Sequence, residues 1–210
     1  MAIDDLLDEH EQSEKVRGWL QKNALSLIGG VALGLGLIGG WQWWQKRTQD
    51  ERSSTSARYA ETVKAIGTDL NKAKTSVAGL PVGSEYAALA SLQLAKAQVD
   101  AGKRDDAIAT LRGIKTEDPG IAGTVSQRLA RLLTDAGKPK EALQLLADAN
   151  DAGGLEAKGD AYVALAQHDA AREAYARALT LLDAGSADRR LLELKLTDAG
   201  GSPSKPGGKT

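Results

Sequence analysis

The chain has 210 residues, a formal net charge of −1 and no cysteine. The absence of cysteine excludes disulfides, thiolate zinc sites and cysteine nucleophiles, and the near-neutral charge provides no basic field for nucleic acid. Ala and Leu supply most of the apolar residues, and there is no Phe. Because Ala and Leu favour helices, and few β-branched or aromatic residues alternate with period two, the sequence predicts an all-α protein.

Residues 24–41 form an apolar run in which only Ser26 is polar. As a helix this run is roughly 27 Å long, about the hydrocarbon thickness of a bilayer. Tryptophans cluster at its end, in positions 41–44, and tryptophan prefers the headgroup layer. A buried core helix is the alternative, but a helix that is apolar on all faces is typical of a membrane span. We predict a transmembrane helix over residues 23–44.

The flanks of this run bear on processing and orientation. Signal peptides have a short basic start and a small-residue cleavage site, whereas an acid-rich segment precedes this run and the bulky sequence WQWWQKR follows it. An uncleaved signal-anchor therefore fits better. The flanking cations slightly favour a cytoplasmic C-terminal side. They are Lys15, Arg17 and Lys22 before the span and Lys46, Arg47, Arg52 and Arg58 after it.

Small residues recur at every fourth position of the span. Ser26, Gly30 and Gly34 form one series, and Gly36 and Gly40 form another. Small side chains allow two membrane helices to approach closely, so we predict that this stripe packs against another membrane helix. The alternative is the general abundance of glycine in membrane helices.

A polar connecting helix is expected over residues 45–80. Its sparse apolar stripe has helical spacing, and the sequence GLPVG at residues 79–83 ends it. The stripe consists of Tyr59, Val63, Ile66 and Leu70.

Three helical hairpins and a final helix are expected over residues 81–200. The paired helices are Ser84–Ala101 with Asp105–Ile114, Ile121–Ala136 with Pro139–Ala149, and Leu155–Gln167 with His168–Leu182, followed by Asp188–Leu196. The tail over residues 201–210 is rich in Gly, Pro, Ser and Lys and is predicted to be disordered.

The hairpins resemble the tetratricopeptide repeat, a family with small residues where two helices cross and a glycine in the turn. The matching positions are Leu94, Ala95, Gly102, Ala107, Leu111, Pro119, then Leu129, Ala130, Gly137, Ala142, Leu146, Ala149, then Gly159, Tyr162, Ala171, Tyr175 and Ala178. The third hairpin departs from the pattern because Ala166 stands in place of the turn glycine. The resemblance implies a degenerate helical-hairpin solenoid after the membrane helix.

In such a solenoid the working surface is the concave face, which the first helix of each hairpin lines. The residues expected to form this protein-binding groove are Leu89, Leu92, Lys96, Val99, Gln127, Arg131, Glu156 and Asp160. The mixture of charged and apolar groups indicates a protein segment as ligand. The alternative is that these are ordinary solvated positions.

The layout as a whole is similar to the YfgM family, the ancillary subunits of the SecYEG translocon in Gram-negative bacteria. The similarity is carried by EQSEKVRGWLQKNALSLIGGVALGLGLIGGWQWWQ and by the degenerate repeats behind it. It implies a cytoplasmic N-terminal segment over residues 1–22, one inner-membrane span, and a periplasmic domain. The implied function is a non-enzymatic adaptor that binds the Sec translocon and a membrane-anchored periplasmic chaperone and assists translocated proteins. The alternative is a negative regulator whose N-terminal segment sequesters a cytoplasmic stress-response factor.

No motif for catalysis, cofactor binding or metal binding stands out. His10 and His168 each lack a second histidine nearby in the sequence. The glycines of residues 29–40 lie inside the apolar run with no strand before them, so they do not form a phosphate loop. We therefore expect no enzyme activity, no cofactor or metal, no nucleic-acid partner and no small-molecule substrate.

Overall fold

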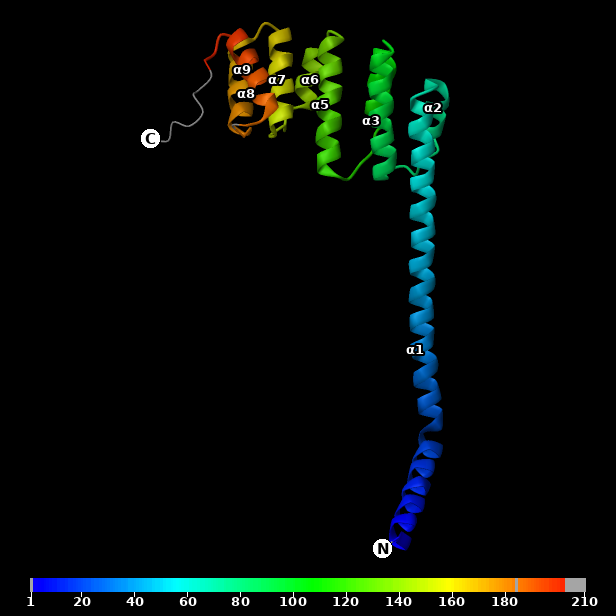
Figure 1. The fold of residues 1–210 in the computed structure, drawn as a ribbon. Helices are drawn as coiled ribbons and strands as arrows, with labels where there is room; N and C mark the ends of the chain where they lie inside the picture. The colour runs from blue at the N-terminus through cyan, green and yellow to red at the C-terminus, as the bar shows by residue number, and fades with distance from the viewer. Residues whose placement is uncertain (1, 184, 203–210) are drawn as a thin grey trace, which may run out of the picture. The chain divides into compact units, whose positions relative to one another are not determined.

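The computed structural model describes residues 2–183 and 185–202, with side chains from residue 13 onward except those of residues 51 and 52. The described residues form nine helices and no strand (Figure 1), which confirms the predicted all-α class. The chain divides into two units, Met1–Ser54 and Thr55–Thr210. Residues 203–210 of the tail that was expected to be disordered lie outside the described residues.

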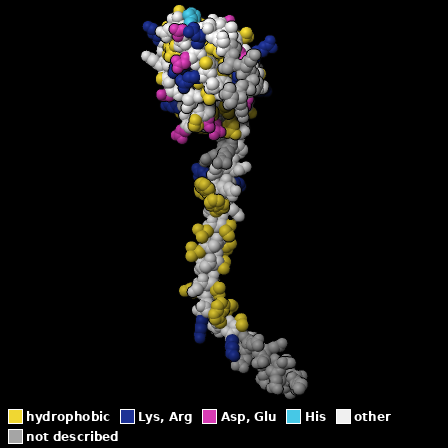
Figure 2. Space-filling view, turned by 90° about the vertical axis from the view of Figure 1, so that its left-hand side faces the viewer, with side chains coloured by type: hydrophobic (Ala, Val, Ile, Leu, Met, Phe, Trp, Pro, Cys, Tyr) yellow, Lys and Arg dark blue, Asp and Glu magenta, His cyan; other side chains and the backbone are white. Residues whose placement is uncertain are grey.

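The first unit consists of the helix α1, which runs from Ala2 to Ile66 and continues into the second unit. No proline occurs before Pro81, so nothing in the sequence removes a backbone hydrogen bond from this helix. Among the residues with described side chains, α1 is the one helix long and apolar enough to cross a membrane. None of its apolar window is buried, and Figure 2 shows hydrophobic side chains projecting along it. The helix therefore lacks the burial of a soluble core helix.

The second unit begins with the last turns of α1, which pack on α2 (Leu70–Ala78) and α3 (Glu85–Asp100). The rings of Tyr59 and Tyr86 lie 5.3 Å apart, and Gln93 donates a hydrogen bond of 2.8 Å to the Tyr59 hydroxyl. The small core beneath consists of Ala65, Ala73 and Leu94. The end of α1 and α2 thus form a further helix pair before the three predicted hairpins.

The expected continuous helix over residues 45–80 is wrong at residues 67–69, where the structure separates α1 from α2. The cause is a local cap. Asp69 has an extended backbone, and its carboxylate accepts hydrogen bonds from two backbone N–H groups in the first turn of α2. The sequence Gly-Thr-Asp was the available signal for this break.

The three hairpins follow as predicted, side by side in Figure 1. They pair α3 with α4 (Arg104–Arg112), α5 (Pro119–Asp135) with α6 (Pro139–Leu145), and α7 (Ala152–Ala164) with α8 (His168–Thr180), and α9 (Ala187–Asp198) follows. Side chains of Ser84, Asp118 and Asp151 cap the first helix of each hairpin by accepting backbone N–H groups. The first helix of each hairpin therefore begins at a polar side chain suited to that role.

Small residues occupy the helix crossings, as the repeat pattern requires. The fully buried alanines of the described chain are Ala73, Ala90, Ala107, Ala130, Ala142, Ala161, Ala171 and Ala178. Larger side chains such as Leu111, Leu133 and Leu146 fill the space between hairpins, and Tyr175 does so in the third. Because interiors are close-packed, a larger residue at a crossing would push the two helices apart.

The three hairpin turns share one backbone conformation. Gly102 and Gly137 have φ angles of 73° and 74°, and Ala166 has 56° in the corresponding turn. A left-handed backbone suits glycine and costs an L-residue roughly 1–2 kcal/mol. The third hairpin therefore keeps the same turn conformation, with a strained alanine in place of the glycine.

Candidate functional site

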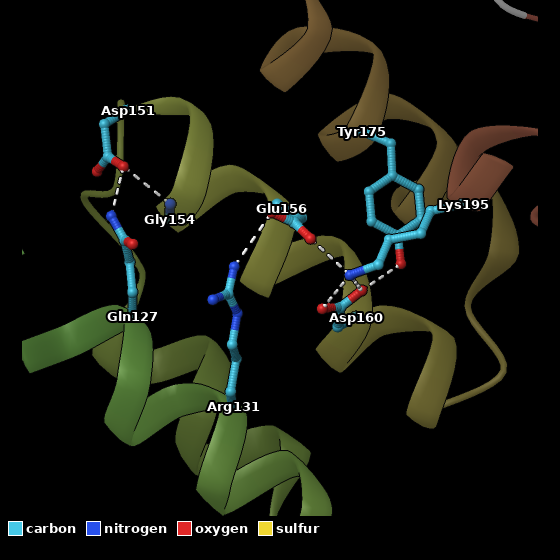
Figure 3. Close-up of polar contacts among 8 residues, drawn as sticks. All are labelled: Gln127, Arg131, Asp151, Gly154, Glu156, Asp160, Tyr175 and Lys195. Atoms are coloured by element: carbon cyan, nitrogen blue, oxygen red, sulfur yellow. Dashed lines mark hydrogen bonds and ion pairs between the residues drawn. The ribbon is translucent and has the colours of Figure 1, made fainter. Parts of the chain in front are cut away.

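The first helices of the hairpins, together with α9, make one face of the second unit. We call the side of α3, α5, α7 and α9 that carries the expected groove residues the first-helix face. Its two halves differ. A set of polar contacts links α5, α7 and α9 (Figure 3), whereas α3 and α5 contact each other sparingly.

The polar contacts begin between α5 and α7. Asp151 caps α7 by accepting the N–H of Gly154 at 2.9 Å, and the same oxygen, Oδ1, accepts a 2.6 Å hydrogen bond from Gln127 Nε2. One turn further along α5, Arg131 Nη2 donates to Glu156 Oε2 at 3.1 Å. These contacts fix α5 on α7 from the solvent side.

Lys195 of α9 completes the set, which we call the Lys195 cluster: Arg131, Glu156, Asp160, Tyr175 and Lys195. Its Nζ lies 2.6 Å from Glu156 Oε1 and 2.8 Å from Asp160 Oδ2. The two carboxylates are four residues apart on α7 and therefore share one helix face. Two acids and two bases pair with each other here, so the charges of the Lys195 cluster are already matched within it.

Tyr175 anchors the cluster from below. Its hydroxyl donates to Asp160 Oδ1 at 2.8 Å, and its ring lies against Gly159, where there is no side chain. Burial, together with the hydrogen bond to Asp160, raises the pKa of Tyr175 well above its ordinary value. The phenol therefore stays protonated and serves as a structural donor.

The other half of the face contains an open groove between α3 and α5, with a volume of about 320 Å³. We call it the α3–α5 groove. Apolar side chains make its floor and three cations stand at its edge. Its lining residues are Leu92, Ala95, Lys96, Val99, Leu111, Arg128, Arg131 and Leu132.

The eight expected groove residues separate between these two halves. Four of them line the α3–α5 groove: Leu92, Lys96, Val99 and Arg131. Glu156 and Asp160 are held by Lys195, and Gln127 by Asp151. Leu89 is exposed on α3 and does not line this groove. Whether these residues bind a partner stays a prediction.

Sequence reasoning missed two residues that shape the face. Arg128 lines the groove one position after Gln127, and its proximity to Arg131 on one helix was the available signal. Lys195 lies in the final helix, and no sequence feature indicated its contact with α7, because a partner 35 residues away depends on tertiary packing.

The glycine stripe of α1 is open. A side chain built at Gly30, Gly34, Gly36 or Gly40 would meet nothing within 4 Å, so the described residues leave room there for another helix. The predicted packing of this stripe stays a prediction. Among the residues whose side chains are described, no group of three acidic or histidine residues is placed to hold a metal, and His168 is exposed at the start of α8.

Comparisons with known proteins agree with this architecture. A family model described as a tetratricopeptide repeat-like domain matches residues 17–201. The chain is thus a protein of the tetratricopeptide repeat-like class with an apolar N-terminal helix. A protein of Escherichia coli named ancillary SecYEG translocon subunit is 32% identical over 145 residues, which cover 66% of this chain and 69% of that protein. A protein of Haemophilus influenzae with the same name is 23% identical over 145 residues, covering 67% of this chain and 71% of that protein.

The chain therefore belongs to the family of the ancillary SecYEG translocon subunits, the YfgM family, as the sequence resemblance predicted. No solved structure matches it significantly.

Proposed function

We propose that this protein is a non-enzymatic inner-membrane adaptor that associates with the Sec translocon and assists the handling of translocated proteins. The observation that carries the proposal is the 32% identity to a relative named ancillary SecYEG translocon subunit, over about two thirds of both chains. A helical-repeat domain, whose long surface suits protein partners, supports it.

The apolar part of α1 gives the adaptor its location. A span that holds the repeat domain at the membrane raises its effective concentration beside a channel, so weak contacts suffice. We propose that residues 1–22 lie in the cytoplasm and that the repeat domain lies in the periplasm. The flanking cations slightly oppose this orientation, but long domains translocate largely regardless of charge.

The first partner to test is the translocon itself. An affinity-tagged full chain, expressed in a Gram-negative host and solubilised in mild detergent, is expected to co-purify with SecY. In a variant of the tagged chain, residues 24–41 are replaced by an unrelated apolar sequence of the same length. Loss of SecY from this variant would assign the contacts to the span, and its retention would assign them to the rest of the chain. As a positive control, another tagged Sec-associated protein is purified in the same way and should retain SecY. Absence of SecY from the eluate of the wild-type chain, while the control retains it, would contradict the proposal.

The second partner is a membrane-anchored periplasmic chaperone, which we propose binds the repeat domain. Cross-linking before solubilisation, followed by mass spectrometry, is expected to join residues after position 55 to such a chaperone. Cross-links from the cytoplasmic segment to a soluble cytoplasmic factor instead would favour the regulator.

A further inference from the structure

We propose that the α3–α5 groove binds a protein segment in which leucine- or valine-sized side chains lie next to carboxylates. This inference rests on the proposed function, which puts a protein-binding surface on the first-helix face. The inference limits the binding surface to the α3–α5 half of the first-helix face and specifies which side chains the ligand presents.

Packing leaves only this half of the face open. Between α5, α7 and α9, the Lys195 cluster and the Gln127–Asp151 hydrogen bond join neighbouring helices. Between α3 and α5 the groove is open to solvent, and its volume of about 320 Å³ is at the lower end of the range for small-molecule sites. A groove of that size takes a few side chains of a longer chain rather than a whole cofactor.

The floor of the groove is apolar. Leu92, Ala95, Val99, Leu111 and Leu132 line it from three helices. Val99 is 41% exposed. A partner's apolar side chain placed on it would remove water from both side chains, which is favourable. The floor therefore favours aliphatic side chains in the ligand.

The edge of the groove is cationic. Its lining includes Lys96, Arg128 and Arg131 and no acidic residue. Arg128 is exposed and makes no hydrogen bond or ion pair with the described residues. Lys96 is paired with Asp100, but both side chains are largely exposed, at 71% and 61%, and such a pair contributes little. Two cations are thus available for partner carboxylates beside the apolar floor.

Charge also argues against the chain's own tail as the occupant. Residues 201–210 carry Lys205 and Lys209 and no acidic side chain, so they offer no carboxylate side chain to the cations of the groove edge. A partner with carboxylates next to aliphatic residues has the opposite character and matches both parts of the groove.

The test uses the full chain in nanodiscs of zwitterionic lipid and fluorescence anisotropy of labelled peptides. Three decapeptides serve as probes: one with leucines alternating with aspartates, one with lysines in place of the aspartates, and one with alanines in place of the leucines. We expect saturable binding of the first peptide only, weakened as salt is raised, with empty nanodiscs as background. Equal binding of the aspartate and lysine peptides, or no binding of either, would overturn the proposal.

Matched variants locate the binding. Arg128→Glu is expected to weaken peptide binding at least tenfold. Its control is Arg190→Glu, which should leave binding unchanged; Arg190 is an exposed arginine of α9 without a described partner. Val99→Asp is also expected to weaken binding at least tenfold. Val163→Asp is its control and should leave binding unchanged, because both valines are 41% exposed. Equal losses in a variant and its control would place the peptide elsewhere and refute the assignment.

Two further readouts separate this inference from its alternatives. If a second copy of this chain fills the groove, light scattering shows a dimer that Val99→Asp dissociates, and the peptide does not bind; that result overturns the inference. Co-purification of SecY with the wild-type chain tests the proposed function independently. Peptide binding without SecY would leave the groove chemistry standing and refute only the translocon association.

Discussion

Replacement of Gly159 by alanine tests whether the third hairpin is held at one close crossing. A Cβ atom at this position would lie 2.5 Å from Cδ1 and 2.8 Å from Cζ of Tyr175, which real carbon contacts essentially never show. The ring cannot move freely, because its hydroxyl is bonded to Asp160. Overpacking of this kind costs typically about 1–3 kcal/mol, which exceeds the gain of about 1 kcal/mol from replacing a helical glycine by alanine. We expect Gly159→Ala to lower the stability of the repeat domain.

Gly123 provides the matched control. It also lies inside a helix, and a Cβ atom there would meet nothing within 4 Å, so Gly123→Ala is expected to stabilise by up to about 1 kcal/mol. Thermal unfolding of the detergent-solubilised chain, followed by circular dichroism, measures both, and each kcal/mol corresponds to about 2–4 °C. In the background of Tyr175→Leu, which removes the ring, the penalty of Gly159→Ala should shrink. Equal midpoints for the Gly159 and Gly123 variants would refute the close crossing.

Three other predictions follow from the same structure. Ala166→Gly is expected to stabilise the domain by about 0.5–1 kcal/mol in urea denaturation, because it relieves the φ of 56°, whereas Gly137→Ala should destabilise it; equal signs would contradict the shared turn conformation. Burial raises the pKa of folded Tyr175 above its usual value of 10, so the stability that depends on the protonated phenol is complete below pH 10 and declines above it. The free energy of unfolding of the wild type should therefore lose its advantage over that of Tyr175→Phe between pH 10 and 11.5. A constant difference over that range would exclude the buried phenol. Replacing Gly30 and Gly34 by isoleucine should reduce cross-linking of the span to a neighbouring membrane helix, while Gly29→Ile should not; unchanged cross-linking would remove the small-residue stripe from the interface.

The periodic features of the fold could be predicted from the sequence. The apolar run of residues 24–41 and the alanines at the helix crossings depend on local spacing, so the long apolar helix and the hairpins could be predicted from them. The break at residues 67–69 was missed, because a sparse apolar stripe continued through it and outweighed a single capping aspartate.

The candidate site was less accessible to sequence reasoning. The repeat pattern placed Lys96, Val99 and Arg131 on one face, and all three line the α3–α5 groove, since a helix position fixes the direction of its side chain. It could not distinguish the open half from the closed half. That difference depends on Lys195, whose ion pairs with Glu156 and Asp160 join residues 39 and 35 positions apart.

Protease accessibility of the repeat domain in spheroplasts tests directly whether this domain lies in the periplasm. The chain carries an epitope tag after Gly208, and a cytoplasmic protein and a periplasmic protein are followed as controls. For a periplasmic domain, we expect external protease to remove the tag from intact spheroplasts while the cytoplasmic control survives. Protection of the tag until lysis would put the domain in the cytoplasm, and both the periplasmic adaptor and its chaperone partner would then be wrong.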